Sequence, residues 1–176
     1  MGAIPLVLIA MVWMTVLAVA AARSVTIVPQ QHAYVVERLG RYHTTLEAGV
    51  HLRVPFIDVV RHKHALAEQT IAVPGEACRT RDDRQVWIDG LVAVKVVDGR
   101  KASYETSDYR AAIGQLARTV LRRRVADVEL DRLHADRDVT CTAIAADLRA
   151  AADGWGVAVL RYDMTDISRH KKESAA

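Results

Sequence analysis

Apolar and polar residues follow three successive patterns along this chain. Residues 4–22 are apolar and carry no charge, with Pro5 and Thr15 as the only interruptions. From residue 24 to about residue 97 apolar residues mostly alternate with polar ones, and from residue 107 they recur at helical spacing. The patterns predict a long apolar helix, then a set of short strands, then helices that pack on the sheet.

The apolar run at the start is long enough to cross a bilayer, which requires about 20 residues in a helix. We therefore expect an uncleaved transmembrane anchor over residues 1–23. The alternative is a secretory signal peptide cleaved after residues 18–20, which read Ala-Val-Ala. The run has no preceding Lys or Arg and exceeds the usual apolar length of a signal peptide, and both features favour the anchor.

Cations beside the apolar run indicate its orientation. No Lys or Arg precedes the run, whereas Arg23, Arg38 and Arg41 follow it. Positive residues near the end of a span tend to remain in the cytoplasm. The following domain is therefore expected on the cytoplasmic face of a membrane.

The middle and the end of the chain predict one domain over residues 24–168, followed by a polar tail over 169–176. The predicted strands are residues 24–28, 33–39, 41–46, 50–54, 56–66, 70–73, 76–80, 86–96 and 155–167. A helix with Ser107 as N-cap and a second helix over 136–153, ended by Gly154, come late in the chain. In the last strand Val157, Val159, Arg161 and Asp163 are expected on one side. Strands first and helices later, without repeated βαβ units, predict the α+β class.

Composition narrows the function. The 176 residues have a formal net charge of +3, and aromatic residues make up 5%. Nucleic-acid binding would require clustered cations interleaved with stacking side chains, and this pattern is missing except near Arg122, Arg123 and Arg124. Mild basicity fits a domain beside anionic lipid headgroups, so membrane lipid is the expected partner and nucleic acid is not.

Candidate catalytic or metal-binding residues are few. His62 and His64 place two imidazoles on one face of a predicted strand, without a convincing third ligand, and are interpreted as surface histidines. Asp82 and Asp83 are adjacent acids flanked by arginines, as in a polar turn. The two cysteines are far apart in sequence and are expected to be free thiols. With no nucleophile, nucleotide or metal motif, we expect neither an enzyme nor a cofactor, metal or catalytic site.

Several segments in order resemble a known family. They are YVVERLGRY (residues 34–42), LEAGVHLRVPFID (46–58), TRD (80–82), VWIDG (86–90), ELD (129–131), WGVAV (155–159) and DI (166–167). Together they resemble the SPFH (band 7) domain of stomatins, prohibitins and flotillins, with the bacterial stomatin-like, or paraslipin, branch nearest. Ala48 and Ala126 depart from the usual Pro and Gly of the family.

The resemblance implies a membrane scaffold that self-associates laterally, organises a membrane patch and regulates membrane proteases or transporters. Family members usually continue into a long charged helix that drives assembly, whereas this chain ends at Ala176, so a homo-oligomer formed by that route is expected to be weakened. Two other functions stay open. One is a secreted or periplasmic binding module released by signal cleavage, and the other is a membrane-tethered hydrolase built from scattered Ser, His and Asp.

Val54, Pro55, Phe56 and Ile57 are the candidate membrane-contact residues. The resemblance implies that this end of the domain lies near the bilayer, where an apolar tip would enter the interface. The alternative is that Phe56, the only phenylalanine in the chain, fills the core. We expect Phe56 in the core.

Overall fold

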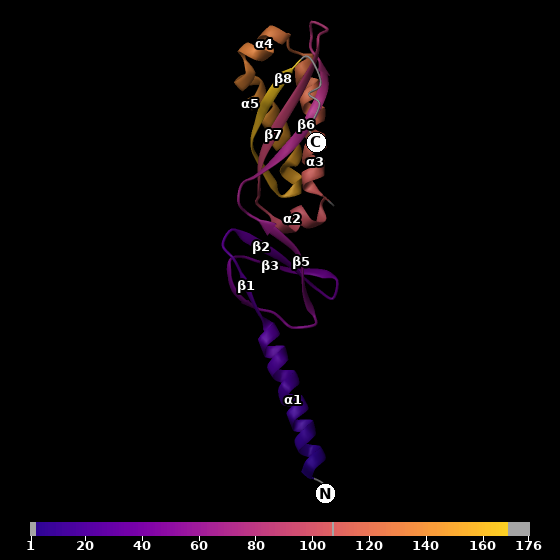
Figure 1. Cartoon of the computed structure of the whole chain (residues 1–176), viewed down its shortest axis with the longest axis vertical. Helices are drawn as coiled ribbons and strands as arrows, with labels where there is room; N and C mark the ends of the chain where they lie inside the picture. Colours follow the sequence, from indigo (N-terminus) through magenta and orange to yellow (C-terminus); the bar gives the residue numbers. More distant parts are fainter. Residues whose placement is uncertain (1–2, 107, 169–176) are drawn as a thin grey trace. The chain divides into compact units, whose positions relative to one another are not determined.

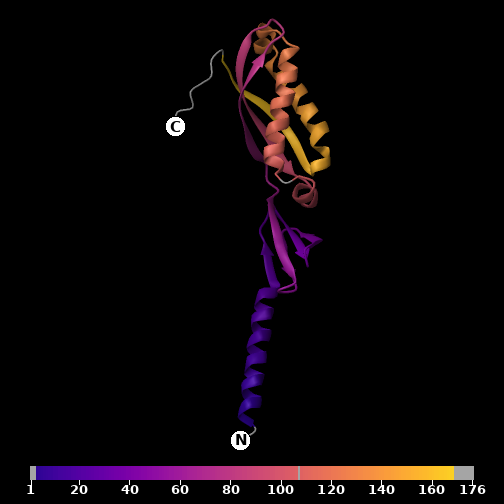
Figure 2. The same cartoon turned by 90° about the vertical axis from the view of Figure 1, so that its right-hand side faces the viewer.

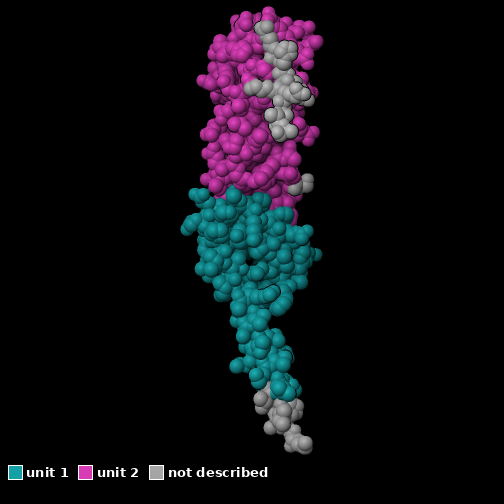
Figure 3. Space-filling view, viewed as in Figure 1, with its two compact units in different colours: residues 1–65 teal, residues 66–176 magenta. Residues whose placement is uncertain are grey.

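A computed structural model describes residues 3–106 and 108–168, with side chains described from residue 8. The chain forms two compact units, residues 1–65 and 66–176 (Figure 3). Both mix helix and sheet, and they are described separately below. The tail at 169–176 lies outside the described residues, and the predicted boundaries at 24 and 168 stay predictions.

Unit 1 consists of one helix followed by two small antiparallel sheets (Figure 1). Its elements are α1 (Ala3–Ser24), β1 (Val25–Val28), β2 (His32–Arg38), β3 (Arg41–Leu46), β4 (Gly49–Leu52) and β5 (Asp58–Ala65). β1 pairs with β4, and the other three strands form a sheet in the order β3-β2-β5. The core is small: Val28, Val36 and Leu46 are buried, with Tyr34 and Val60 packed against them.

The helix α1 exposes apolar side chains on all sides. The exposed ones are Leu8, Ile9, Met11, Val12, Trp13, Met14, Val16, Leu17 and Val19. Counting only the residues whose side chains are described, which leave out residues 1–7, no helix is long and apolar enough to cross a membrane.

Unit 2 is a three-stranded antiparallel sheet covered by helices on one face (Figure 2). Its elements are β6 (Gln69–Arg79), β7 (Gln85–Val96), α2 (Gly99–Tyr104), α3 (Tyr109–Ala126), α4 (Leu130–Ala135), α5 (Arg137–Ala152), the 3₁₀ helix η1 (Asp153–Trp155) and β8 (Val157–Ser168). The strand order is β6-β7-β8, α3 packs on β6 and α5 packs on β8. The α+β class is therefore confirmed.

The core of unit 2 lies between this sheet and the two long helices. Ile88, Ile113, Leu121, Ile144 and Leu148 are all fully buried there. Burial of such a side chain contributes roughly 1.5–3 kcal/mol. The core of unit 2 is therefore far larger than that of unit 1, and most of the hydrophobic stabilisation of the fold lies in unit 2.

The β6–β7 hairpin is joined to the start of α4. The Thr80 hydroxyl donates to Asp82 Oδ1 at 2.6 Å, and the same oxygen accepts the Leu130 backbone N–H at 3.2 Å. Arg81 forms an ion pair with Glu129. The hydrogen bond from the Thr80 hydroxyl is the main cause that lowers the pKa of Asp82, and the hydrogen bond from the Leu130 N–H also lowers it. Desolvation acts in the opposite direction. Asp82 thus caps α4, whose own N-cap residue, Glu129, makes no side-chain capping hydrogen bond.

Three features of the elements differ from expectation. The strands predicted at 70–73 and 76–80 form the single strand β6, because a bulge between Val73 and Glu76 absorbs the Pro-Gly pair. The helix α2 was not predicted. Gly154 does not end α5 in a left-handed conformation; η1 follows α5, and Gly156 is the left-handed residue.

The start of α3 and the face of β8 also differ from expectation. Ser107 lies outside the described residues, and α3 begins at Tyr109 after the N-cap Asp108. In β8, a register shift opposite Ala93 and Val94 leaves Arg161 and Asp163 exposed, and buries Tyr162 and Met164 beside Val157 and Val159.

Candidate membrane-facing surface

The loop between β4 and β5 carries the four candidate membrane-contact residues. The Asp58 backbone N–H donates to the Val54 carbonyl at 3.0 Å, and the Val54 N–H donates to Asp58 Oδ2 at 2.8 Å. These two bonds close the loop on itself. At its tip Phe56 has a left-handed φ of 67°.

Phe56 is 81% exposed, so its predicted place in the core is wrong. The closed turn leaves its ring in solvent, and the small core of unit 1 is formed by other residues. Val54 and Ile57 are also exposed and Pro55 is half-buried. The loop therefore presents apolar surface outward, which is a common feature of sites that meet a membrane or another protein.

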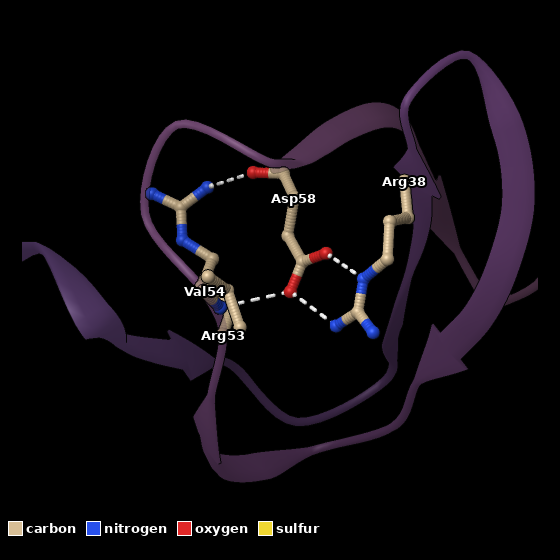
Figure 4. A network of polar contacts seen from close by, with 4 residues as sticks. All are labelled: Arg38, Arg53, Val54 and Asp58. Atoms are coloured by element: carbon tan, nitrogen blue, oxygen red, sulfur yellow. Dashed lines mark hydrogen bonds and ion pairs between the residues drawn. The ribbon is translucent and has the colours of Figure 1, made fainter.

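Arg38 and Asp58 hold this loop against β2 (Figure 4). Arg38 Nε donates to Asp58 Oδ1 at 2.6 Å, and Arg38 Nη2 donates to Oδ2 at 3.0 Å. The Asp58 side chain is 3% exposed. This bidentate ion pair joins the ERLG segment to the VPFID segment. Arg38 and Asp58 are 20 residues apart in sequence, so the pair gives a physical reason for both motifs.

The same contacts lower the pKa of Asp58 to about 2. The hydrogen bond from Arg38 is the main cause, followed by the N–H of Val54, and desolvation acts in the opposite direction. The folded-state pKa lies below the ordinary value of 3.8, so the folded state favours the ionised carboxylate. The resulting stability is present above about pH 4 and is lost as the pH falls toward 2.

We expect the variant Asp58→Asn to lower the urea midpoint at pH 5, because it leaves Arg38 without its anion. The difference from wild type should shrink between about pH 4 and pH 2, where Asp58 of the wild-type chain becomes protonated. Denaturation of the detergent-solubilised chain at several pH values measures this. A difference that is constant down to pH 2 would mean that the Arg38–Asp58 pair does not carry the charge-dependent stability.

A second apolar surface lies on the β1–β4 ribbon. Val25 pairs with Leu52 and Ile27 pairs with Val50, and all four side chains are 47–81% exposed. Cross-strand partners share a face of the sheet, so these residues form one apolar face, which we call the ribbon face. The sequence predicted both strands but not this exposure, because an alternating pattern does not reveal whether its apolar face is covered.

Charge is distributed unequally between the units. Residues 1–65 contain six Lys or Arg and three Asp or Glu, so they carry +3, the whole formal net charge. In unit 2 many arginines are paired; Arg123 and Arg124 both contact Asp147, and Arg122 contacts Glu76. The excess positive charge therefore lies in the unit that also holds α1 and the exposed apolar residues.

The other candidate residues are not assembled into a reactive site. His62 and His64 stack on β5 with ring centroids 6.1 Å apart, and within the described part of the chain no three His, Cys, Asp or Glu side chains are placed to hold a metal. Cys78 and Cys141 are free thiols. Burial raises the pKa of Cys78 to about 11 and also raises that of Cys141, so both favour the unreactive protonated form.

Comparison with known proteins matches residues 26–173 to the SPFH domain / Band 7 family. The human mitochondrial stomatin-like protein 2 is 38% identical over 143 residues, which cover 81% of this chain and 40% of that protein. Stomatin-like protein stl-1 of Caenorhabditis elegans is 34% identical over 148 residues, or 84% of this chain and 46% of that protein. An uncharacterized protein of Methanothermobacter thermautotrophicus is 36% identical over 152 residues, which cover 86% of this chain and 48% of that protein. The chain spans less than half the length of these relatives, and the resemblance found in its motifs is confirmed.

Proposed function

Because this chain belongs to the SPFH domain / band 7 family, whose stomatin-like members are membrane scaffold proteins, we propose that it is a membrane-anchored scaffold. It associates laterally with further copies of itself, organises a patch of membrane and brings membrane proteases or transporters together. It does so without catalytic turnover.

The observation that carries this proposal is the helix α1. It continues without a charged residue from Ile4 to Ala22 and is followed at Val25 by the first strand. A helix that is apolar on all sides is stable when it is surrounded by apolar material, and the sheets of unit 1 leave its described side chains exposed. The apolar run starts four residues before the first described side chain, and its full length is close to that of a span.

The loop residues Val54, Pro55, Phe56 and Ile57, together with the ribbon face, form the proposed membrane-contact surface. A span through α1 would bring the start of β1 to the end of the helix at the membrane interface. Exposed aromatic and aliphatic side chains at that level gain free energy by entering the acyl boundary. Arg23 in the last turn of α1, and Arg38 and Arg41 after the helix, support a cytoplasmic location of the domain.

Lateral association explains how an inert domain acts. Anchoring confines weakly interacting domains to a thin layer, so their effective concentration rises and weak contacts become occupied. Proteases or transporters that touch the scaffold are then held near one another. Neither a metal nor a cofactor is required.

The test is the mass of the detergent-extracted chain beside a variant that lacks residues 1–22. We expect the mass of the full-length chain to be a whole-number multiple, two or more, of the 19.4 kDa of one copy, and the shortened variant to dissociate on dilution. Light scattering corrected for detergent measures both masses, and crosslinking in native membranes is the control for detergent artefacts. A monomer in detergent and in the membrane would contradict assembly and leave only an anchored domain.

A further inference from the structure

Arg53 lies at the junction of three parts of unit 1. It directly follows β4 and precedes the Val54–Ile57 loop. Its backbone N–H donates to the carbonyl of Ser24, the last residue of α1, at 2.8 Å. This bond extends the β1–β4 pairing by one position and fixes Arg53 at the end of the helix.

The charge of Arg53 has no carboxylate beside it in the part of the chain that the structure describes. Among the described residues, Arg53 forms no ion pair with a carboxylate; the side-chain bond from its Nη1 goes to the Asp58 carbonyl at a long 3.5 Å. Its Nε is buried without a hydrogen-bond partner in the same part of the chain. Figure 4 shows the contrast between the two arginines. Arg38 donates to the Asp58 carboxylate through both Nε and Nη2, while the second terminal nitrogen of Arg53 points away from Asp58.

A half-buried arginine with an unused terminal nitrogen is suited to an external anion. The guanidinium fork matches the oxygens of phosphate and retains its charge at every physiological pH. The flanking Val54 and Phe56 are exposed and apolar, so an anion with an adjacent apolar tail fits the surroundings better than a free ion. Arg23, exposed at the end of α1 and also without a carboxylate partner among the described residues, adds a second cation next to Ser24.

We propose that Arg53 binds the phosphate of an anionic lipid headgroup. This inference rests on the proposed function, because a helix α1 that spans the bilayer ends in the headgroup layer and brings Arg53 to the same depth. The bound phosphate compensates the arginine, and its acyl chains continue past the exposed loop. The site fixes the height of unit 1 at the surface and makes the domain prefer membranes rich in anionic lipid.

The experiment is native mass spectrometry of the full-length chain, extracted in mild detergent and stripped of lipid, with phosphatidylglycerol or phosphatidylcholine added back. We expect Arg53→Gln to weaken phosphatidylglycerol binding by about tenfold, the effect of losing one charge-assisted contact. Arg61→Gln is the matched control, since it removes one charge from an exposed position on β5 of the same unit. It should bind phosphatidylglycerol as the wild-type chain does, and phosphatidylcholine should bind weakly to all variants.

Each alternative has its own outcome. If wild type and Arg53→Gln bind phosphatidylglycerol equally, Arg53 is not the binding site. If Arg61→Gln loses as much phosphatidylglycerol binding as Arg53→Gln, the effect is one of net charge and not of a specific site. Inorganic phosphate that binds as tightly as phosphatidylglycerol would contradict the lipid as the ligand. Circular dichroism checks that each variant folds. If Arg53→Gln does not fold, Arg53→Lys replaces it; this variant keeps the charge but loses the guanidinium fork, so its loss of phosphatidylglycerol binding should be smaller than about tenfold.

Failure of the anchor and failure of the lipid site are distinguishable. If alkaline carbonate releases the wild-type chain from membranes, the proposed function is wrong irrespective of lipid binding. If the wild-type chain resists carbonate and Arg53→Gln still binds phosphatidylglycerol fully, only the headgroup inference is wrong.

Discussion

The double variant Val12→Arg/Val16→Arg is expected to be released from membranes by alkaline carbonate, under conditions in which the wild-type chain stays in the pellet. The two positions lie near the middle of α1, one turn apart, and both side chains are exposed. An arginine at the centre of a membrane helix costs about 2.5–3.5 kcal/mol on insertion scales. Two of them cost about 5–7 kcal/mol, which shifts the partition by more than about a thousandfold.

The control is Val12→Leu/Val16→Leu, which keeps the helix apolar and should fractionate as wild type. Because neither side chain is buried in unit 1, circular dichroism of all three chains should be the same. Membrane retention of the double arginine variant would mean that α1 does not hold the chain in the bilayer. The mature N-terminus of the wild-type chain separates the remaining alternative: Met1 or Gly2 agrees with an anchor, and Ala21 with a cleaved signal peptide.

Regular alternation made most of the strands predictable from sequence. β7, a long half-buried strand, is observed at Gln85–Val96 against a predicted 86–96, and the β2–β3 hairpin is also within one residue of its prediction. Bulges defeated the same reasoning elsewhere. One extra residue at a bulge in β6 or β8 changes which side chains face the core. A prediction from strict alternation of apolar and polar residues does not include such an insertion.

The missed helix and the misplaced turn have a local cause. α2 has only six residues, too few to display a helical period, and its N-cap Asp98 looked like the end of a strand. After α5, two glycines stand two residues apart, and the sequence offers no way to tell which is left-handed. The intervening 3₁₀ turn moves that role from Gly154 to Gly156.

The candidate surface was found only in part from the sequence. The loop at residues 54–57 was singled out by its motif, but the exposure of Phe56 depends on contacts that Asp58 makes with Val54 and with the distant Arg38. A partner 20 residues away is not visible in a local pattern. The charge of Arg53 was hidden for the same reason, since its position is understood only once the Asp58 carboxylate is known to pair with Arg38.

Substitution of Gly156 in unit 2 is expected to be strongly destabilising. It has a left-handed φ of 69°, and its carbonyl accepts the N–H groups of Val97 and Asp98 at 2.9 and 3.0 Å. A Cβ built at this position would lie 2.5 Å from the Asp98 carbonyl oxygen and 2.6 Å from Lys101 Cβ. The backbone of the WGV motif is thus packed directly on the start of α2, which gives a physical reason for glycine there.

We therefore expect Gly156→Ala to lower the free energy of unfolding by about 2–5 kcal/mol, from about 1–2 for the left-handed conformation and about 1–3 for the close contact with Asp98. Gly154→Ala is the matched control, because a Cβ at Gly154 meets no atom within 4 Å and its φ is not left-handed. It should be neutral or stabilising by less than about 1 kcal/mol. Urea unfolding of the full-length chain in detergent, followed by circular dichroism, measures both differences. If the two variants were equally stable, the turn at Gly156 would not need a glycine, and Asp98 and α2 would have to shift to accept the added methyl group at little cost.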